Sequence, residues 1–236
     1  MGRTISATVW RAPGFIAGAF LIALIVVLCV WADAGYGDGR THAQSDVSRG
    51  LPLRFDSEIV RLFIEDDSLK VEGTYRLLCR PRRVAIVSLL FPYPVDSLLG
   101  GARTSCVKCR VPGGNWQAVS YEELPQRMGA RWMVPLDLGD TLDVHTVYHQ
   151  AILASYARYI VTTTSAWGRP LRKARFEIYL PEDARDPQFS FPFEYQVLGD
   201  RSCYCFEAIG FMPDRDITVS WNHASDGRSG TESASH

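Results

Sequence analysis

The chain has 236 residues, of which 47% are hydrophobic and 22% are charged, and its formal net charge is −1. This composition is typical of a globular protein and excludes a wholly disordered chain. A chain so close to neutral offers no strongly basic field, so we expect no nucleic-acid partner.

An apolar segment near the N-terminus comes first. Residues Phe15 to Val30 contain no charged and no strongly polar side chain. Arg3 and Arg11 precede this segment, whereas Asp33 and Asp38 follow it. Because positive charge tends to stay on the cytoplasmic side, this asymmetry predicts that the remainder of the chain is translocated.

Two fates of this segment remain open. Ala32 and Ala34 form the small-residue pattern that signal peptidase requires, which favours cleavage after Ala34. An uncleaved anchor is the rival, because residues 14–32 are numerous enough to cross about 30 Å of hydrocarbon; a buried core helix is the third reading. We therefore predict a signal peptide or membrane anchor over residues 1–34. The product would be periplasmic or extracellular, or a single-pass membrane protein with its C-terminal domain outside.

The rest of the chain divides by composition. Residues 35–54 are rich in Gly, Asp, Ser and Arg and predict a solvated linker. Residues 55–221 predict the folded domain, as one unit or as two small β subdomains. Residues 222–236 are dominated by Ser, Gly, Asp and His and predict a disordered tail.

Alternating hydrophobicity marks most of the folded part. The clearest strand is Leu69 to Cys79, in which apolar and charged side chains alternate, and it should form a hairpin with Ser57 to Ile64. A second hairpin is predicted around the turn 112–115, whose residues are Pro, Gly, Gly and Asn. The other predicted strands are 84–91, 132–136, 142–148, 157–164, 171–180, 194–198, 202–208 and 216–221. Residues 150–156 read either as a loop or as one helical turn.

About eleven short strands without a long amphipathic helix predict an all-β fold. We expect an antiparallel β-sandwich, immunoglobulin-like or related, because antiparallel sheets bury one face and leave the other wet. A barrel is the alternative.

The sharpest candidates for chemistry are two cysteine pairs, Cys106 with Cys109 and Cys203 with Cys205. Four thiolates in two close pairs could hold zinc, but thiols of an exported protein usually oxidise, so we favour disulfides. Cys203 and Cys205 share a strand face, whereas Cys106 and Cys109 face opposite ways. The simplest hypothesis is a staple between the two regions. With Cys79 the number of exported cysteines is odd, which leaves one thiol over.

Other motifs add little. His145 and His149 have a helical metal-binding spacing, but their β-branched neighbours favour a strand, on which four residues span about 13 Å. No nucleophile elbow, zinc-peptidase helix or phosphate-binding loop occurs in the sequence. We therefore predict no catalytic residue and no cofactor.

Trp167 is a candidate ligand platform, because it stands in a predicted turn where an exposed ring could stack on a sugar. Aromatic residues of sandwiches more often lie in the core, and that reading stays open.

Several segments carry a resemblance: Tyr156 to Thr164 leading to Trp167, Ala174 to Pro181 and Phe211 to Trp221, with Leu69 to Tyr75 and Phe91 to Pro94. Together they resemble bacterial exported β-rich domains of unknown function over most of residues 55–221. The resemblance implies location and fold, and it carries over no catalytic residue. The cysteine pairs are not part of its pattern.

These observations favour a non-catalytic binding or structural domain of the cell envelope. Its partners would be envelope proteins or glycans, and the membrane itself if the N-terminal segment stays uncleaved. A carbohydrate-binding module is the first alternative, and a zinc- or thiol-dependent enzyme is the second.

Overall fold

The structure, a computed structural model, describes residues 29–30, 53–79, 85–136, 141–199 and 201–224. Most of the N-terminal segment and of the linker, the turn at 80–84 and the residues from 225 onward lie outside this description. The described part contains fifteen strands and two short 3₁₀-helices. None of its helices is long and apolar enough to cross a membrane.

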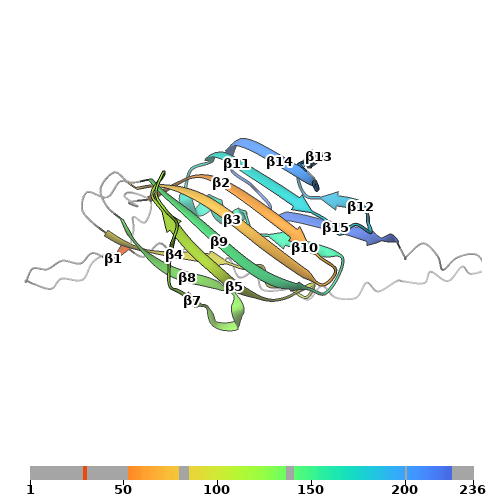
Figure 1. The fold of residues 1–236 in the computed structure, drawn as a ribbon, viewed down its shortest axis with the longest axis horizontal. Coiled ribbons are helices and arrows are strands. Elements are labelled where there is room, and N and C mark those ends of the chain that lie inside the picture. The colour runs from red at the N-terminus through yellow and green to blue at the C-terminus, as the bar shows by residue number, and fades with distance from the viewer. Residues whose placement is uncertain (1–28, 31–52, 80–84, 137–140, 200, 225–236) are drawn as a thin grey trace, which may run out of the picture.

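One large sheet organises the molecule (Figure 1). Its eight strands, in spatial order, are β13 (Glu194–Leu198), β14 (Arg201–Phe211), β11 (Leu171–Tyr179), β2 (Leu53–Ile64), β3 (Ser68–Cys79), β9 (Thr141–Ile152), β5 (Leu99–Arg110) and β6 (Gln117–Ala118). Neighbouring strands run antiparallel except β11 and β2, which are parallel. The predicted hairpin of β2 and β3 is present, with Ile64 opposite Leu69.

Two smaller sheets lie behind the large one in Figure 1. The first contains β1 (Cys29–Val30), β4 (Ala85–Pro92), β8 (Gly129–Leu136) and β7 (Tyr121–Glu123). The second contains β10 (Tyr156–Tyr159), β15 (Ile217–His223) and β12 (Ala184–Phe189). The 3₁₀-helices are η1 (Pro125–Arg127) and η2 (Thr162–Trp167). The predicted all-β, mainly antiparallel layered fold is confirmed.

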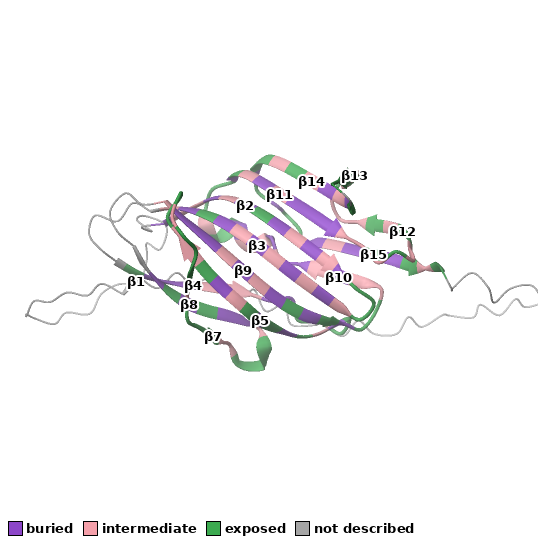
Figure 2. Cartoon of the chain, viewed as in Figure 1, coloured by how far each residue is buried: buried purple, intermediate pink, exposed green. Residues whose placement is uncertain are grey.

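The period of two along the strands explains this layering. Buried and exposed positions alternate along β2, β9 and β5 (Figure 2). Val60, Leu62, Val71 and Tyr148 are almost fully buried and face the smaller sheets. One continuous core of buried side chains, drawn from all three sheets, fills the space between the layers. Burying these apolar faces is the main force that holds the layers together.

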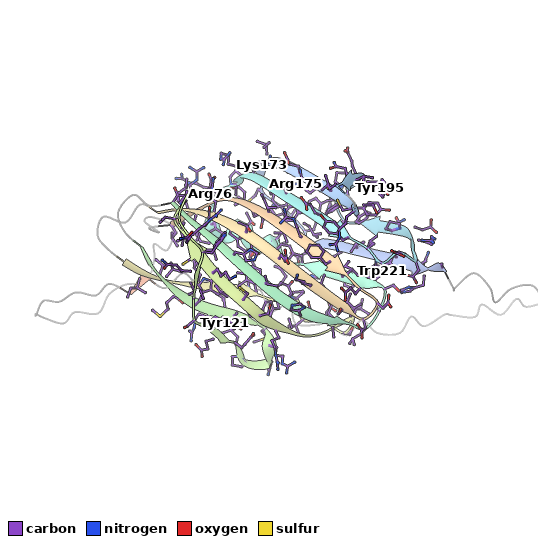
Figure 3. The ribbon with its side chains drawn as sticks, viewed as in Figure 1. Arg76, Tyr121, Lys173, Arg175, Tyr195 and Trp221 are labelled. Carbon is purple, nitrogen blue, oxygen red and sulfur yellow. The ribbon has the colours of Figure 1, made fainter. Side chains whose placement is uncertain are left out.

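The outer face of the large sheet is polar and carries ion pairs between neighbouring strands. Arg76 of β3 bonds Asp143 of β9 at 2.8 Å, and Arg61 of β2 bonds Glu177 of β11 at 2.8 Å. Lys173 projects from β11 at the upper edge of the view and meets Glu207 at 2.8 Å (Figure 3). Such pairs place opposite charges next to each other on adjacent strands, so this face of the sheet is suited to contact with solvent.

Some strand predictions were wrong in their limits. The predicted strand 157–164 is extended only as far as Tyr159, and Thr162 begins the helix η2. Asp216 explains the break, because its carboxylate accepts bonds from the backbone N–H groups of Val161 and Thr162 at 3.1 Å each. Residues up to Ile152, which we read as a loop or a helical turn, extend β9. Residues 184–189 form an additional strand, β12.

Candidate ligand-binding pocket

A pocket opens between the inner face of the large sheet and the smaller layers. Six aromatic rings surround it, those of Phe55, Tyr75, Phe91, Trp132, Tyr159 and Trp167. Of the described residues that line it, Glu58 alone carries a carboxyl group. The free space measures about 70 Å³, roughly half of an apolar cavity that holds benzene. It suits a chemical group of a few atoms.

A β-bulge in β2 places two of the lining residues. Phe55 lies opposite Leu77 and Ser57 lies opposite Arg76, so Asp56 is an extra residue in the strand. Residues three apart normally face opposite sides of a strand, but the additional residue lets both Phe55 and Glu58 face inward. Asp56 turns to the outer face, where Arg172 binds it at 2.9 Å.

Glu58 is the most unusual side chain of the pocket. It is only 4% exposed, and its Oε1 has no hydrogen-bond partner among the described residues. Burial disfavours the charged form and raises the pKa of Glu58 from 4.5 to about 8. The carboxyl is therefore mainly protonated at neutral pH.

Two tyrosines line the pocket beside Glu58. Tyr75 is the cross-strand neighbour of Glu58, and its hydroxyl lies 3.0 Å from the hydroxyl of Tyr159 on β10. This hydrogen bond joins the large sheet to one of the smaller sheets. Burial raises the pKa of both phenols, so both remain neutral throughout the physiological range.

The Tyr75 ring folds back over Gly73, two residues earlier on the same face of β3. A Cβ atom at Gly73 would collide with the Tyr75 hydroxyl. A side chain at this position would therefore force the Tyr75 ring to move.

Trp167 is the last residue of the helix η2 and lines the pocket. The C-cap of η2 is Gly168, whose φ of 66° is in the left-handed region that glycine adopts readily. The Trp167 ring is half-buried, with its centroid 5.7 Å from that of Phe55. The indole nitrogens of Trp167 and of Trp132 on β8 have no hydrogen-bond partner in the described part of the chain. Trp167 thus lines a pocket that also contains buried groups.

The structure does not bring the two cysteine pairs together. Cys106 and Cys109 lie on β5, whereas Cys203 and Cys205 lie on β14, and five strand spacings separate these strands. At ~4.8 Å per spacing the distance is about 24 Å, so the hypothesis of a staple between the two regions does not agree with this structure. For the same reason the four sulfurs cannot share one zinc ion here.

Each pair has its own surroundings. Cys109 packs against the core and lies opposite Val144 of β9. Cys106 lies opposite Val147 of β9, on the other face of β5. The sulfurs of Cys203 and Cys205 lie 3.3 Å apart on the outer side of β14, and both residues are buried. Burial also raises the pKa of the Cys205 thiol. No group of three or more metal-binding side chains occurs among the described residues, and His145 instead contacts Thr74 and Trp116.

Sequence reasoning did not single out Glu58 as a buried carboxyl group, although a signal was present. Glu58 has the same parity as Val60, Leu62 and Ile64, which places it on their face of the strand. A carboxyl on an apolar face indicates a buried titratable group, and such groups are candidates for functional sites. The Asp56 bulge leaves this parity intact because it lies before Glu58.

No protein-family model matches the chain, and no curated protein matches it by sequence. Solved structures do resemble it. A Legionella pneumophila protein, provisionally described as a nutrient binding protein, superposes with a TM-score of 0.52 at 12% identity, over 72% of this chain and 67% of its own length. An M1 zinc metallopeptidase from Deinococcus radiodurans gives a TM-score of 0.45 at 13% identity, over 72% of this chain and 42% of its own length. The likeness to the Legionella protein shows that a bacterial protein has this fold, and nothing further.

Proposed function

We propose that this chain is an extracytoplasmic, non-catalytic binding domain that holds a small ligand in the aromatic pocket beside Glu58. The observation that carries the proposal is the place of Glu58 in the lining of that pocket, together with a buried carboxyl oxygen, Oε1, that has no hydrogen-bond partner among the described residues. A buried polar atom without a hydrogen bond costs about 1–3 kcal/mol, and such a cost commonly marks a functional site.

The pocket wall supports the same proposal. Ligand sites are concave and mostly apolar, with a few polar groups that orient the ligand. Here six rings provide the apolar wall, and Glu58 provides a carboxyl group. The provisional description of the Legionella protein as a nutrient binding protein is compatible with a small-molecule ligand.

The size of the pocket bears on the glycan alternative. A space of about 70 Å³ is smaller than one that holds benzene, so a whole sugar ring does not enter it. Trp167, at the edge, remains the residue through which a glycan would bind. Glycan-array binding that Trp167→Ala abolishes would support the carbohydrate-binding module instead.

The export part of the proposal rests on the N-terminal sequence. The apolar run from Phe15 to Val30, the preceding arginines and the Ala32 and Ala34 site support translocation. We infer that residues 55–221 then work as one module, since one continuous core connects all three sheets. Fractionation of cells that express the tagged full chain tests this part: a cytosolic, uncleaved product would contradict it.

A screen of fragments of up to about five non-hydrogen atoms tests the binding site itself, read through the indole N–H signals in ¹⁵N spectra. Bound fragments should shift the signals of Trp132 and Trp167 and leave that of Trp116, which stacks under Arg110 on the outer face. Single Trp→Phe variants at the three positions assign the signals. If no fragment shifts the Trp132 and Trp167 signals of the folded protein, the proposed site is wrong.

A further inference from the structure

The aromatic pocket combines a carboxyl group with ring faces, and this combination selects the charge of its ligand. The faces of Phe, Tyr and Trp rings are electron-rich and attract cations. A carboxylate attracts cations too. Resting on the proposed function, we propose that the ligand is a small organic ammonium ion, bound with its nitrogen at the Glu58 carboxylate and its carbon atoms against the rings.

An anionic ligand does not suit this pocket. No lysine, arginine or histidine is among the described residues that line it. Among the described lining residues, the ionisable groups are those of Glu58, Tyr75 and Tyr159, all of which are neutral or negative. An anion would therefore lose its water without gaining a positive partner.

A purely apolar ligand would leave the polar group of the pocket without a partner. It would fill the space between the rings and leave the Glu58 carboxyl group without a polar partner. An ammonium group carries several N–H donors and can bond to this carboxyl group. Charge-assisted hydrogen bonds of this kind are about twice as strong as neutral ones. The buried charges then neutralise each other, which a lone carboxylate cannot achieve.

The pocket also limits the size of the ammonium ligand. About 70 Å³ of space admits a nitrogen with a short carbon chain, and the pocket is open enough for a longer substituent to extend outward. The class is therefore a primary alkylamine or the amino end of a larger molecule.

Binding should release a proton, because the carboxyl is mainly protonated when the pocket is empty. Among the residues that the structure describes, the titratable groups that face Glu58 are the hydroxyl of Tyr75 from β3 and that of Tyr159 from β10. The facing residue of β11 is Ala174, and Phe91 of β4 and Trp132 of β8 do not titrate. Both phenols stay protonated below about pH 10. The pH dependence of binding from about pH 6 to 9 therefore reports on Glu58 alone within the pocket.

Isothermal titration of the folded protein with n-butylammonium and with n-butanol tests this inference. Affinity for n-butylammonium should rise about tenfold per pH unit from about pH 6 and level off above about pH 8, as Glu58 ionises. It should fall again only as the amine loses its own proton near about pH 10. The affinity for n-butanol should not rise with pH. Titration at about pH 7 in two buffers of different ionisation enthalpy should show nearly one proton released per amine bound.

A substitution gives the matched control. Glu58→Gln keeps the shape of the pocket and removes its charge, so it should lower the affinity for n-butylammonium at about pH 8 by at least about thirtyfold, or about 2 kcal/mol, and preserve n-butanol binding. Glu122→Gln, which changes an exposed carboxylate paired with Arg131, should leave both affinities unchanged.

The outcomes separate the two proposals. If n-butanol binds as tightly as n-butylammonium and the amine shows no rise with pH, the ammonium inference is overturned while the pocket remains a binding site. If neither probe binds, and no fragment shifts the Trp132 and Trp167 signals, both proposals are overturned.

Discussion

Glu58 sets how the stability of the folded domain depends on pH. Its pKa is raised from 4.5 in the unfolded chain to about 8 in the folded one, so the folded state prefers the protonated form. The contribution of Glu58 is then fully present below about pH 4.5, and it is lost as the pH rises toward about 8. The loss amounts to about 1.4 kcal/mol per pH unit within this window.

Glu58→Gln should remove this pH dependence, because the amide does not titrate. Urea unfolding at about pH 5 and about pH 7 measures it: the wild-type free energy of unfolding should fall by about 2 kcal/mol more than that of the variant. Asp216 and Glu177 titrate below this window, since their pKa values are lowered, and they contribute equally to both proteins. Equal slopes for the two proteins would show that Glu58 is ionised in the folded state at pH 7.

Asp216 holds the turn that carries Trp167. Burial opposes the ionisation of Asp216, but hydrogen bonds from Arg158 at 2.6 Å and from Thr162 at 2.8 Å outweigh it and lower its pKa. Removing one partner of such a network leaves the other charge buried and unpaired.

We predict that Asp216→Ala lowers the free energy of unfolding by about 3 kcal/mol at pH 7 and weakens ligand binding, because η2 loses its anchor. Asp214→Ala, at an exposed position two residues away, should change stability by less than about 0.5 kcal/mol. Chemical denaturation of both variants makes the comparison. Similar midpoints for the two would contradict this account of the turn.

At the scale of a strand, the alternation of side chains was the reliable signal. The hairpin of β2 and β3 follows from it, as do the strands β9 and β11, because each has one apolar and one polar face. The alternation of side chains does not reveal the features that build the pocket. The bulge at Asp56 has no marker in the sequence, and the turn at Thr162 depends on Asp216, which lies 54 residues later. Contacts so distant in the chain cannot be read from local patterns.

Substitution of Gly73 tests whether the packing of β3 shapes the pocket. Gly73→Ala should displace the Tyr75 ring and break its hydrogen bond to Tyr159, at a cost of about 1–3 kcal/mol and with loss of ligand affinity. Gly113→Ala is the control, since its φ of 82° costs about 1 kcal/mol but its surroundings are open. Thermal unfolding and fragment titration of both variants measure the effects. Unchanged binding in Gly73→Ala would show that Tyr75 does not shape the site.

The strand β14 suggests a revised disulfide prediction. Residues two apart on a strand have Cα atoms about 6.7 Å apart, near the upper limit for a disulfide, and the sulfurs of Cys203 and Cys205 are already in contact at 3.3 Å. In protein purified from the exporting compartment we expect these two to be joined to each other. Intact mass before and after reduction, with peptide mapping, should show the gain of two hydrogen atoms at this site. Free thiols at both positions would contradict the prediction.

Over the whole molecule, composition and periodicity were sufficient to predict an all-β layered fold, because they report which faces are buried. They could not predict which smaller strands cover the large sheet, since that depends on long-range packing among rings such as Tyr93 on Tyr148 and Phe211 on Phe176. The candidate site arises where those layers meet. Trp167 became a candidate because of its position in a predicted turn, and its role as a ligand platform stays a prediction. Glu58 became a candidate only once the layers were in place.

The central claim is that a small ammonium ion occupies the space between the layers and pairs with Glu58. A crystal structure of the protein grown with n-butylammonium above pH 8 tests it most directly. The account predicts the ligand nitrogen within about 3 Å of a Glu58 carboxyl oxygen, with its carbon chain against the rings of Phe55 and Trp167. An empty pocket, or a Glu58 carboxyl bonded to another group of the protein, would contradict it.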